Sequence, residues 1–236
     1  MNVQLNNTLL LREKIEAKYS GSKSTLFKFY DTLFSLLGGN GENTICNNMC
    51  IQNNCDCCEF PQADITEKGK PANTFTGLLP YEIEYLSLKS SPVSFEEKFD
   101  VHESGLGLVC RKIEKKCIRK PLDCALYPYT FANYSNSNEN IFVDILFSKE
   151  KCPIFSNTEL TENFFSITFE RTVNLAHTVA EFDTDILILI CSYAPYYRGF
   201  DRYKTVMIRT GQTSLHNSPD LLHTVDTIPN YNKNAS

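Results

Sequence analysis

The chain has 236 residues, of which 42% are hydrophobic, 22% charged and 12% aromatic, with no Trp and a net charge of -5. That length can bury one large core or two small ones, so no metal is needed merely to hold a small fold together. The composition is that of an ordinary globular protein. Its acidic balance argues against a nucleic-acid binder, because phosphate binding usually shows as a basic excess.

Export and membrane insertion are not indicated. The first eight residues, from Met1 to Thr8, show no basic region followed by an apolar stretch, so they do not resemble a secretory signal. The longest apolar run, Ile186 to Cys191, is far shorter than the roughly 20 residues that cross a bilayer. We therefore expect a cytoplasmic protein without a membrane span.

Two amphipathic helices are predicted in the first part of the chain. Apolar side chains recur at helical spacing over residues 5–18 and 24–37. Ser24 is the predicted N-cap of the second helix, and Gly38 with Gly39 is its predicted stop.

A third, shorter helix is predicted over residues 78–86. Pro80 lies near its first turn, and Glu82 and Glu84 are placed to favour a helix N-terminus. The pattern of residues 91–109 is ambiguous between helix and strand.

The last part of the chain alternates strand and helix patterns. A strand is predicted from Asn140 to Phe147, one long helix from Glu159 to Phe182, and a buried strand from Asp185 to Tyr193. After Asn217 the polar sequence loses periodicity, which predicts a weakly packed or disordered tail. The fold class expected is α+β and helix-rich, with a small number of strands.

The pattern divides the chain into four segments. They are an N-terminal helical segment, a cysteine-rich metal-binding region, a C-terminal helix and strand that complete the core, and a flexible tail, over residues 1–45, 46–155, 156–220 and 221–236.

The cysteines are the most informative feature. Nine of the ten lie between Cys46 and Cys152, and five of these fall within Cys46 to Cys58. In a secreted domain such crowding suggests disulfides, whereas in a reducing cytosol it more often means metal ligation or redox chemistry. Between Gly38 and Pro71 the sequence predicts a loop, whose shape a bound metal would fix.

The cysteines form two groups about fifty residues apart. The first is Cys46, Cys50, Cys55, Cys57 and Cys58; the second is Cys110, Cys117 and Cys124, followed after a strand by Cys152. Pro121 argues against one continuous helix carrying the second group. A four-thiolate site takes ligands from at least two turns, and two such groups meet that need. Soft thiolates select zinc, copper(I) or iron–sulfur.

The spacing favours iron–sulfur over zinc. Structural zinc sites usually repeat a Cys-x2-Cys knuckle, and Cys55 with Cys58 is the one such pair in the sequence. The pair Cys152-Pro153 is similar to the cysteine–proline that closes bacterial ferredoxin motifs.

The cysteine-rich part of the chain resembles a known family. The run Cys55-Asp56-Cys57-Cys58, the helix pattern of residues 78–86, Cys110, the stretch of residues 117–128 and Cys152-Pro153 together resemble the YkgJ-type cysteine-cluster family, also described as a zinc- or iron-chelating domain. The resemblance covers about residues 46–155. The chain departs from the family pattern between Cys117 and Pro121, which are usually three residues further apart, and at Ala125, where an Arg is usual.

The resemblance implies an iron–sulfur or zinc centre. A distant branch of the family includes flagellin lysine N-methylases, which makes methyl transfer a conceivable chemistry. The first-choice ligands lie where the resemblance is densest, and the full order of choice is Cys58, Cys110, Cys117 and Cys124, then Cys50, Cys55, Cys57 and Cys152, and last Cys46. Cys191, within an apolar run, is predicted to be a plain core residue.

Other motifs give weaker indications. The basic stretch of residues 111–120 could be a solvated face, or could lower the energy of an anionic cluster. The glycine pairs have neither a dinucleotide-binding nor a phosphate-loop pattern. No two of the histidines have ligand spacing, and His102 is the one within the metal region. The cluster of tyrosines and arginines in residues 193–203 is more typical of a rim packed on the core than of a base-stacking site.

Three functions follow as hypotheses. The first is a cytoplasmic protein with a [4Fe-4S]-type cluster for redox or substrate-activating chemistry. The second is a structural zinc protein that binds another protein, and the third, supported by resemblance alone, is an S-adenosylmethionine-dependent lysine methyltransferase-like enzyme. The sequence identifies no catalytic residue, and it leaves open whether the partner is a protein or a small molecule.

Overall fold

The structure, a computed structural model, describes residues 3–38, 75–89, 99–101, 105–110, 121–126, 129–137, 140–148, 158–196 and 200–209. The helices are α1 (Val3–Tyr19), α2 (Lys23–Leu36), α4 (Glu82–Lys89), α5 (Leu122–Leu126), α6 (Thr158–Phe182) and α7 (Thr184–Ser192), followed by the short 3-10 helix η3 (Ala194–Tyr196). The strands are β1 (Phe75–Gly77), β2 (Phe99–Val101), β3 (Gly107–Cys110), β4 (Tyr129–Ser137), β5 (Asn140–Ser148) and β6 (Phe200–Arg209). The predicted loop between Gly38 and Pro71 and the predicted tail lie almost wholly outside these residues.

Helices α1 and α2 confirm the pair predicted at the start of the chain. One face of α2 is buried, because its apolar residues recur at helical spacing. Ser22, not the predicted Ser24, occupies the N-cap position, and its side chain makes no capping hydrogen bond. The helix ends at Leu36, and Gly38 follows with a φ of 96°, a left-handed conformation that favours glycine after a helix.

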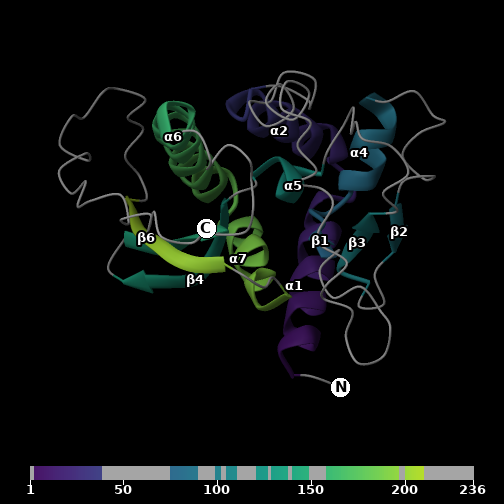
Figure 1. Ribbon diagram of the computed structural model, residues 1–236. Helices are drawn as coiled ribbons and strands as arrows, with labels where there is room; N and C mark the ends of the chain where they lie inside the picture. Colours follow the sequence, from purple (N-terminus) through teal and green to yellow (C-terminus); the bar gives the residue numbers. More distant parts are fainter. Residues whose placement is uncertain are drawn as a thin grey trace, which may run out of the picture.

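The strands form two small antiparallel sheets, so the helix-rich fold is α+β. One sheet has the order β1-β3-β2 and the other β4-β5-β6. Strand β5 confirms the strand predicted from Asn140 to Phe147, and α6 confirms the long helix. In Figure 1 the two sheets lie on either side of α1 and α7.

A single hydrophobic core joins these elements. It takes residues from α1, α2, α6 and α7 and from both sheets. Among its closest contacts are the stacked rings of Phe29 and Phe182, whose centroids lie 3.8 Å apart. Tyr19 stacks on the same Phe182 ring, so α1, α2 and α6 meet at one aromatic cluster.

The predicted strand from Asp185 to Tyr193 is wrong, because these residues form helix α7. Asp183 caps this helix: its side chain accepts a hydrogen bond from the Asp185 N–H at 3.0 Å. Helix α7 packs against β4, α6 and α1. Contact on so many sides explains an almost wholly apolar sequence, since a helix that is hydrophobic all round is a buried one.

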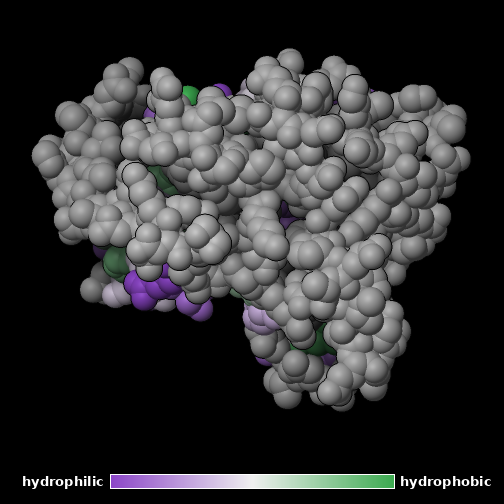
Figure 2. Space-filling view, viewed as in Figure 1, coloured by the Kyte–Doolittle hydropathy of each residue, from purple (hydrophilic) through white to green (hydrophobic). Residues whose placement is uncertain are grey.

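The surface view adds one feature of the second sheet. Tyr129 to Ala132 of β4 are buried, whereas most of the strand's later residues are exposed. Figure 2 shows hydrophilic residues gathered over this part of the molecule. Within the described ranges, no helix has the length and apolar character to span a membrane.

Candidate metal centre

Two of the predicted ligands lie in described elements. Cys124 lies in α5 with a half-buried side chain, and Cys110 is the last residue of β3. These two elements confirm that the second cysteine group is not carried by one continuous helix. The other predicted ligands lie outside the described residues, namely Cys46, Cys50, Cys55, Cys57, Cys58, Cys117 and Cys152.

Helix α5 is only five residues long, and side chains and main chain from elsewhere hold it in place. Its first residue, Leu122, donates its N–H to a carboxylate oxygen of Glu82 at 2.6 Å. The next residue, Asp123, accepts a hydrogen bond from the N–H of Gly77 at 2.8 Å. The third, Cys124, has its sulfur 3.2 Å from the hydroxyl oxygen of Thr76. Three consecutive residues of α5 are therefore bonded to the segment from Thr76 to Glu82.

The segment from Thr76 to Glu82 is itself fixed by buried tyrosines. Tyr193 donates its hydroxyl hydrogen to the carbonyl oxygen of Leu78 at 2.5 Å. Tyr30 does the same to the carbonyl oxygen of Pro80 at 2.6 Å. Because both phenols are buried, each of these hydrogen bonds satisfies two polar groups that water cannot reach.

Tyr81 adds a local strain to this segment. Its φ of 57° is the left-handed conformation, which is uncommon for a residue with a bulky side chain. Its hydroxyl donates to the carbonyl oxygen of Glu16 at 2.9 Å, and Lys23 Nζ lies 4.3 Å from the centre of its ring. Such strain persists where surrounding contacts enforce it, and it is often found at functional sites.

Glu82 joins α4 to α5 through a buried carboxylate. One oxygen accepts the N–H of Leu79 at 2.8 Å and the other accepts the N–H of Leu122. The side chain is 1% exposed. Burial raises the pKa of Glu82 to about 7, against the two N–H donors, which lower it.

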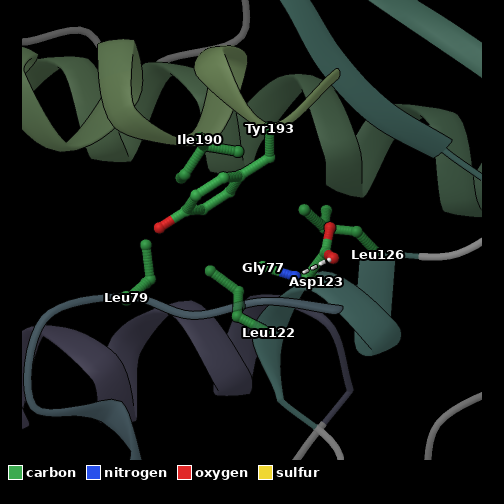
Figure 3. Close-up of a pocket in the computed structure, with 7 residues that line it drawn as sticks. All are labelled: Gly77, Leu79, Leu122, Asp123, Leu126, Ile190 and Tyr193. Carbon is green, nitrogen blue, oxygen red and sulfur yellow. Dashed lines mark hydrogen bonds between the residues drawn. The ribbon is translucent and has the colours of Figure 1, made fainter. Parts of the chain in front are cut away.

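A small cavity lies where these elements meet. Figure 3 shows the Tyr193 ring reaching in from the end of α7, with Gly77 and Asp123 on the opposite wall. The volume open to the centre of a water molecule is about 10 Å³, close to the lower limit for holding one water. The cavity is therefore a packing feature between α5, β1 and α7, with no room for a substrate.

Strand pairing places the main chain of Cys110 near the same junction. Leu108 is the Cα partner of Thr76, and Cys110 follows two residues later in β3. In an antiparallel pair such diagonal neighbours lie about 7–8 Å apart at the Cα atoms. Thr76 therefore lies beside Cys124 on one side and about one diagonal step from Cys110 on the other.

The described elements that border residues 39–74 and residues 111–120 also lie close to this junction. Phe75, which begins β1 after residues 39–74, pairs with Val109, next to Cys110. Residues 111–120 separate Cys110 from Pro121, which precedes α5. Helix α2, which precedes residues 39–74, contacts α5. Two cysteine-bearing stretches are involved, residues 39–74 and residues 111–120. The first lies between α2 and β1, and the second between β3 and α5. Strand β1 pairs with β3, and α2 contacts α5.

The remaining predicted residues are in the core or outside the described ranges. Cys191 is buried in α7, which confirms it as a core residue, and burial raises the pKa of its thiol to about 12. Tyr203 packs on the core as expected of a rim residue, whereas Tyr193 is a buried member of the core itself. His177 lies in α6, where burial lowers its pKa, whereas His102, His216 and His223 and the basic stretch of residues 111–120 are outside the described ranges. In the part of the chain that the structure describes, no three His, Cys, Asp or Glu side chains gather as metal ligands.

Sequence patterns miss the residues that hold α5. Glu82 is recognisable as a helix-start residue, and its bond to Leu79 fits that role. Its bond to Leu122, forty residues away, has no local signal. Thr76 and Tyr193 are likewise ordinary strand and helix-end residues until the fold brings them to α5.

Compared with family models, with curated proteins and with solved structures, the chain gives no significant match.

Proposed function

We propose that this chain holds a cysteine-ligated iron–sulfur cluster of the [4Fe-4S] type, with Cys110 and Cys124 among its ligands. The observation that supports this is the convergence of β3, which ends at Cys110, and α5, which carries Cys124, on the single residue Thr76. A four-thiolate centre takes its ligands from at least two separate segments, and these are two such segments.

The surroundings of Cys124 suit a thiolate ligand. Its side chain is half-buried, so a metal could reach the sulfur, in contrast to the buried Cys191. The hydroxyl of Thr76 lies at hydrogen-bond distance from that sulfur. Hydrogen bonds to ligating atoms orient metal ligands and tune the potential of iron–sulfur centres. When bound, such a cluster would supply one-electron redox or substrate-activating chemistry.

The predicted ligand set is completed by cysteines beyond the described elements. The first-choice set adds Cys58 and Cys117 to the two described positions, and thiolate donors fit iron–sulfur and zinc alike. Zinc in the same thiolates would make the centre a structural one that orders the chain for binding another protein.

Metal analysis of the full chain tests the proposal. Protein purified without oxygen should contain iron and acid-labile sulfide in similar amounts and absorb broadly at about 400 nm. Cys124→Ala should bleach this absorption, and Cys191→Ala, which alters a buried core cysteine, should not. Colourless protein with bound zinc would support the structural zinc alternative instead of the cluster. Protein with neither metal would overturn the proposal.

A further inference from the structure

The carboxylate of Glu82 connects the hydrophobic core to the helix that carries Cys124. It is buried at the start of α4, and its two oxygens accept hydrogen bonds from two segments far apart in sequence, at Leu79 and Leu122. A buried carboxylate is costly to desolvate, so its retention needs bonds that use both oxygens.

Helix α5 depends on such external bonds. Five residues are too few to form a stable helix alone, because the first turn is costly to nucleate and few bonds follow it. Its internal bond from Ala125 N–H to Pro121 carbonyl oxygen, at 3.0 Å, closes one turn. Leu122 opens that turn, and its N–H has Glu82 as acceptor. The first residue of the turn is therefore anchored at Glu82.

The position of Cys124 follows from this turn. Leu122 is anchored by Glu82, Asp123 by the N–H of Gly77, and Cys124 then faces Thr76. If the bond at Leu122 is lost, the two later contacts must hold the turn without its first anchor. Metal ligands commonly depend on outer partners of this kind.

We propose that Glu82 is a positioning residue for Cys124: its carboxylate fixes the start of α5 and thereby holds the cysteine sulfur beside Thr76. The inference rests on the proposed function in so far as Cys124 is a metal ligand. Its structural part, that Glu82 sets the position of Cys124, holds with or without a metal.

Glu82→Gln is the variant that tests it. Glutamine keeps the size of the side chain but has one carbonyl oxygen, so it can accept from Leu79 or Leu122 and places an NH2 group against the other N–H. The matched control is Asp183→Asn, which changes another buried carboxylate that is bonded to protein groups through both oxygens, at the start of α7. Both variants should lose stability, so stability alone does not separate positioning from a general structural role.

The first readout is cobalt binding by reduced, metal-free full-length protein. Glu82→Gln should weaken Co²⁺ binding by about 10–100-fold and alter the thiolate-to-cobalt charge-transfer band, as loss of an outer partner does at other metal sites. Asp183→Asn should bind Co²⁺ as the wild type does. Equal weakening in both variants would overturn the positioning role.

The second readout needs no metal. Iodoacetamide alkylation followed by peptide mass analysis should show faster labelling of Cys124 in Glu82→Gln than in wild type, with Cys191 unchanged. Unchanged labelling of Cys124 would overturn the inference. If the wild type contains neither iron–sulfur nor zinc but Cys124 labelling rises in the variant, the metal proposal fails and the positioning role stands.

Hydrogen exchange in the wild type gives a test without a variant. The Leu122 amide should be protected because Glu82 accepts its N–H. Exchange at the rate of an unstructured amide would overturn the inference, even if Glu82→Gln failed to fold.

Discussion

The ring of Tyr193 occupies the space that a side chain on Gly77 would need. A β-carbon added to Gly77 would lie 2.8 Å from both Cγ and Cε2 of the ring and closer still to Cδ2. Figure 3 shows both residues among those that line the small cavity. The absence of a side chain at Gly77 thus allows Tyr193 to reach the carbonyl oxygen of Leu78.

Gly77→Ala should therefore destabilise the protein by about 1–3 kcal/mol, as overpacking of a filled core does. The ring must move, and the hydrogen bond from Tyr193 to Leu78 is strained or lost. The measurement is urea unfolding followed by circular dichroism. Gly21→Ala is the control, because a β-carbon there would meet nothing within 4 Å. Equal changes in unfolding free energy for the two variants would contradict this account.

Glu82 should make stability depend on pH near neutrality. Its folded-state pKa is about 7, above the ordinary value of 4.5, because burial disfavours the charge. The nearby charged groups are Asp123, which raises this pKa, and Arg12, which lowers it; the buried phenols of Tyr30 and Tyr193 also interact with the carboxylate. With a raised folded pKa, the contribution of the group to stability is full below about 4.5 and is lost as pH rises through about 7.

A comparison with Glu82→Gln isolates this effect. Glutamine does not titrate, so the advantage of the wild type over the variant should be larger at pH 5 than at pH 8. The difference should be on the order of 3 kcal/mol, from about 1.4 kcal/mol for each unit of pKa shift. Urea unfolding of both proteins at the two pH values measures it, and groups common to both, such as His177, cancel. An advantage that is independent of pH would show that the carboxylate keeps an ordinary pKa.

The helices with a clear periodic pattern could be predicted from the sequence. The apolar spacing of residues 24–37 matches the buried face of α2, and the long pattern ending at Phe182 matches α6. Helix α7 could not be read in this way, because the run from Ile186 to Cys191 is apolar on every side and too short to show a period. The informative signal was Asp183, a good N-cap residue directly before the run.

Part of the candidate metal centre could likewise be predicted from the sequence, and part could not. Cysteine spacing predicts a metal site. Pro121 predicts that Cys110 and Cys124 do not share one continuous helix, and they lie in β3 and α5. The residues that place Cys124 could not be predicted, because Thr76 and Glu82 meet α5 only through long-range packing. Local patterns carry no information about contacts made across some forty residues of chain.

Asp183 should contribute strongly to stability where α7 meets α1. One oxygen caps α7, and the other accepts from the buried hydroxyl of Tyr19 and pairs with Lys18, both at 2.8 Å. Asp183→Ala removes the cap and leaves that hydroxyl without an acceptor, so we expect a loss of about 2–4 kcal/mol. Asp185→Ala is the neighbouring control. It breaks a 2.7 Å pair with the exposed Lys14, and such a surface pair is worth less than about 1 kcal/mol. Thermal and urea unfolding of both variants measure the difference, and similar losses would contradict a special role for Asp183.

Cys191 should behave as a core residue in every assay. It is 6% exposed within α7, and burial raises its thiol pKa to about 12, so the thiolate needed for metal binding is scarce at neutral pH. Cys191→Ala should cost about 1 kcal/mol through a small cavity. Cys191→Ser should cost more, because its hydroxyl enters an apolar site. Urea unfolding ranks the variants, and parallel metal analysis should find the same metal content in both as in the wild type. Loss of metal from Cys191→Ala, with its unfolding free energy nearly unchanged, would place Cys191 among the ligands and remove the distinction between this buried thiol and the half-buried Cys124.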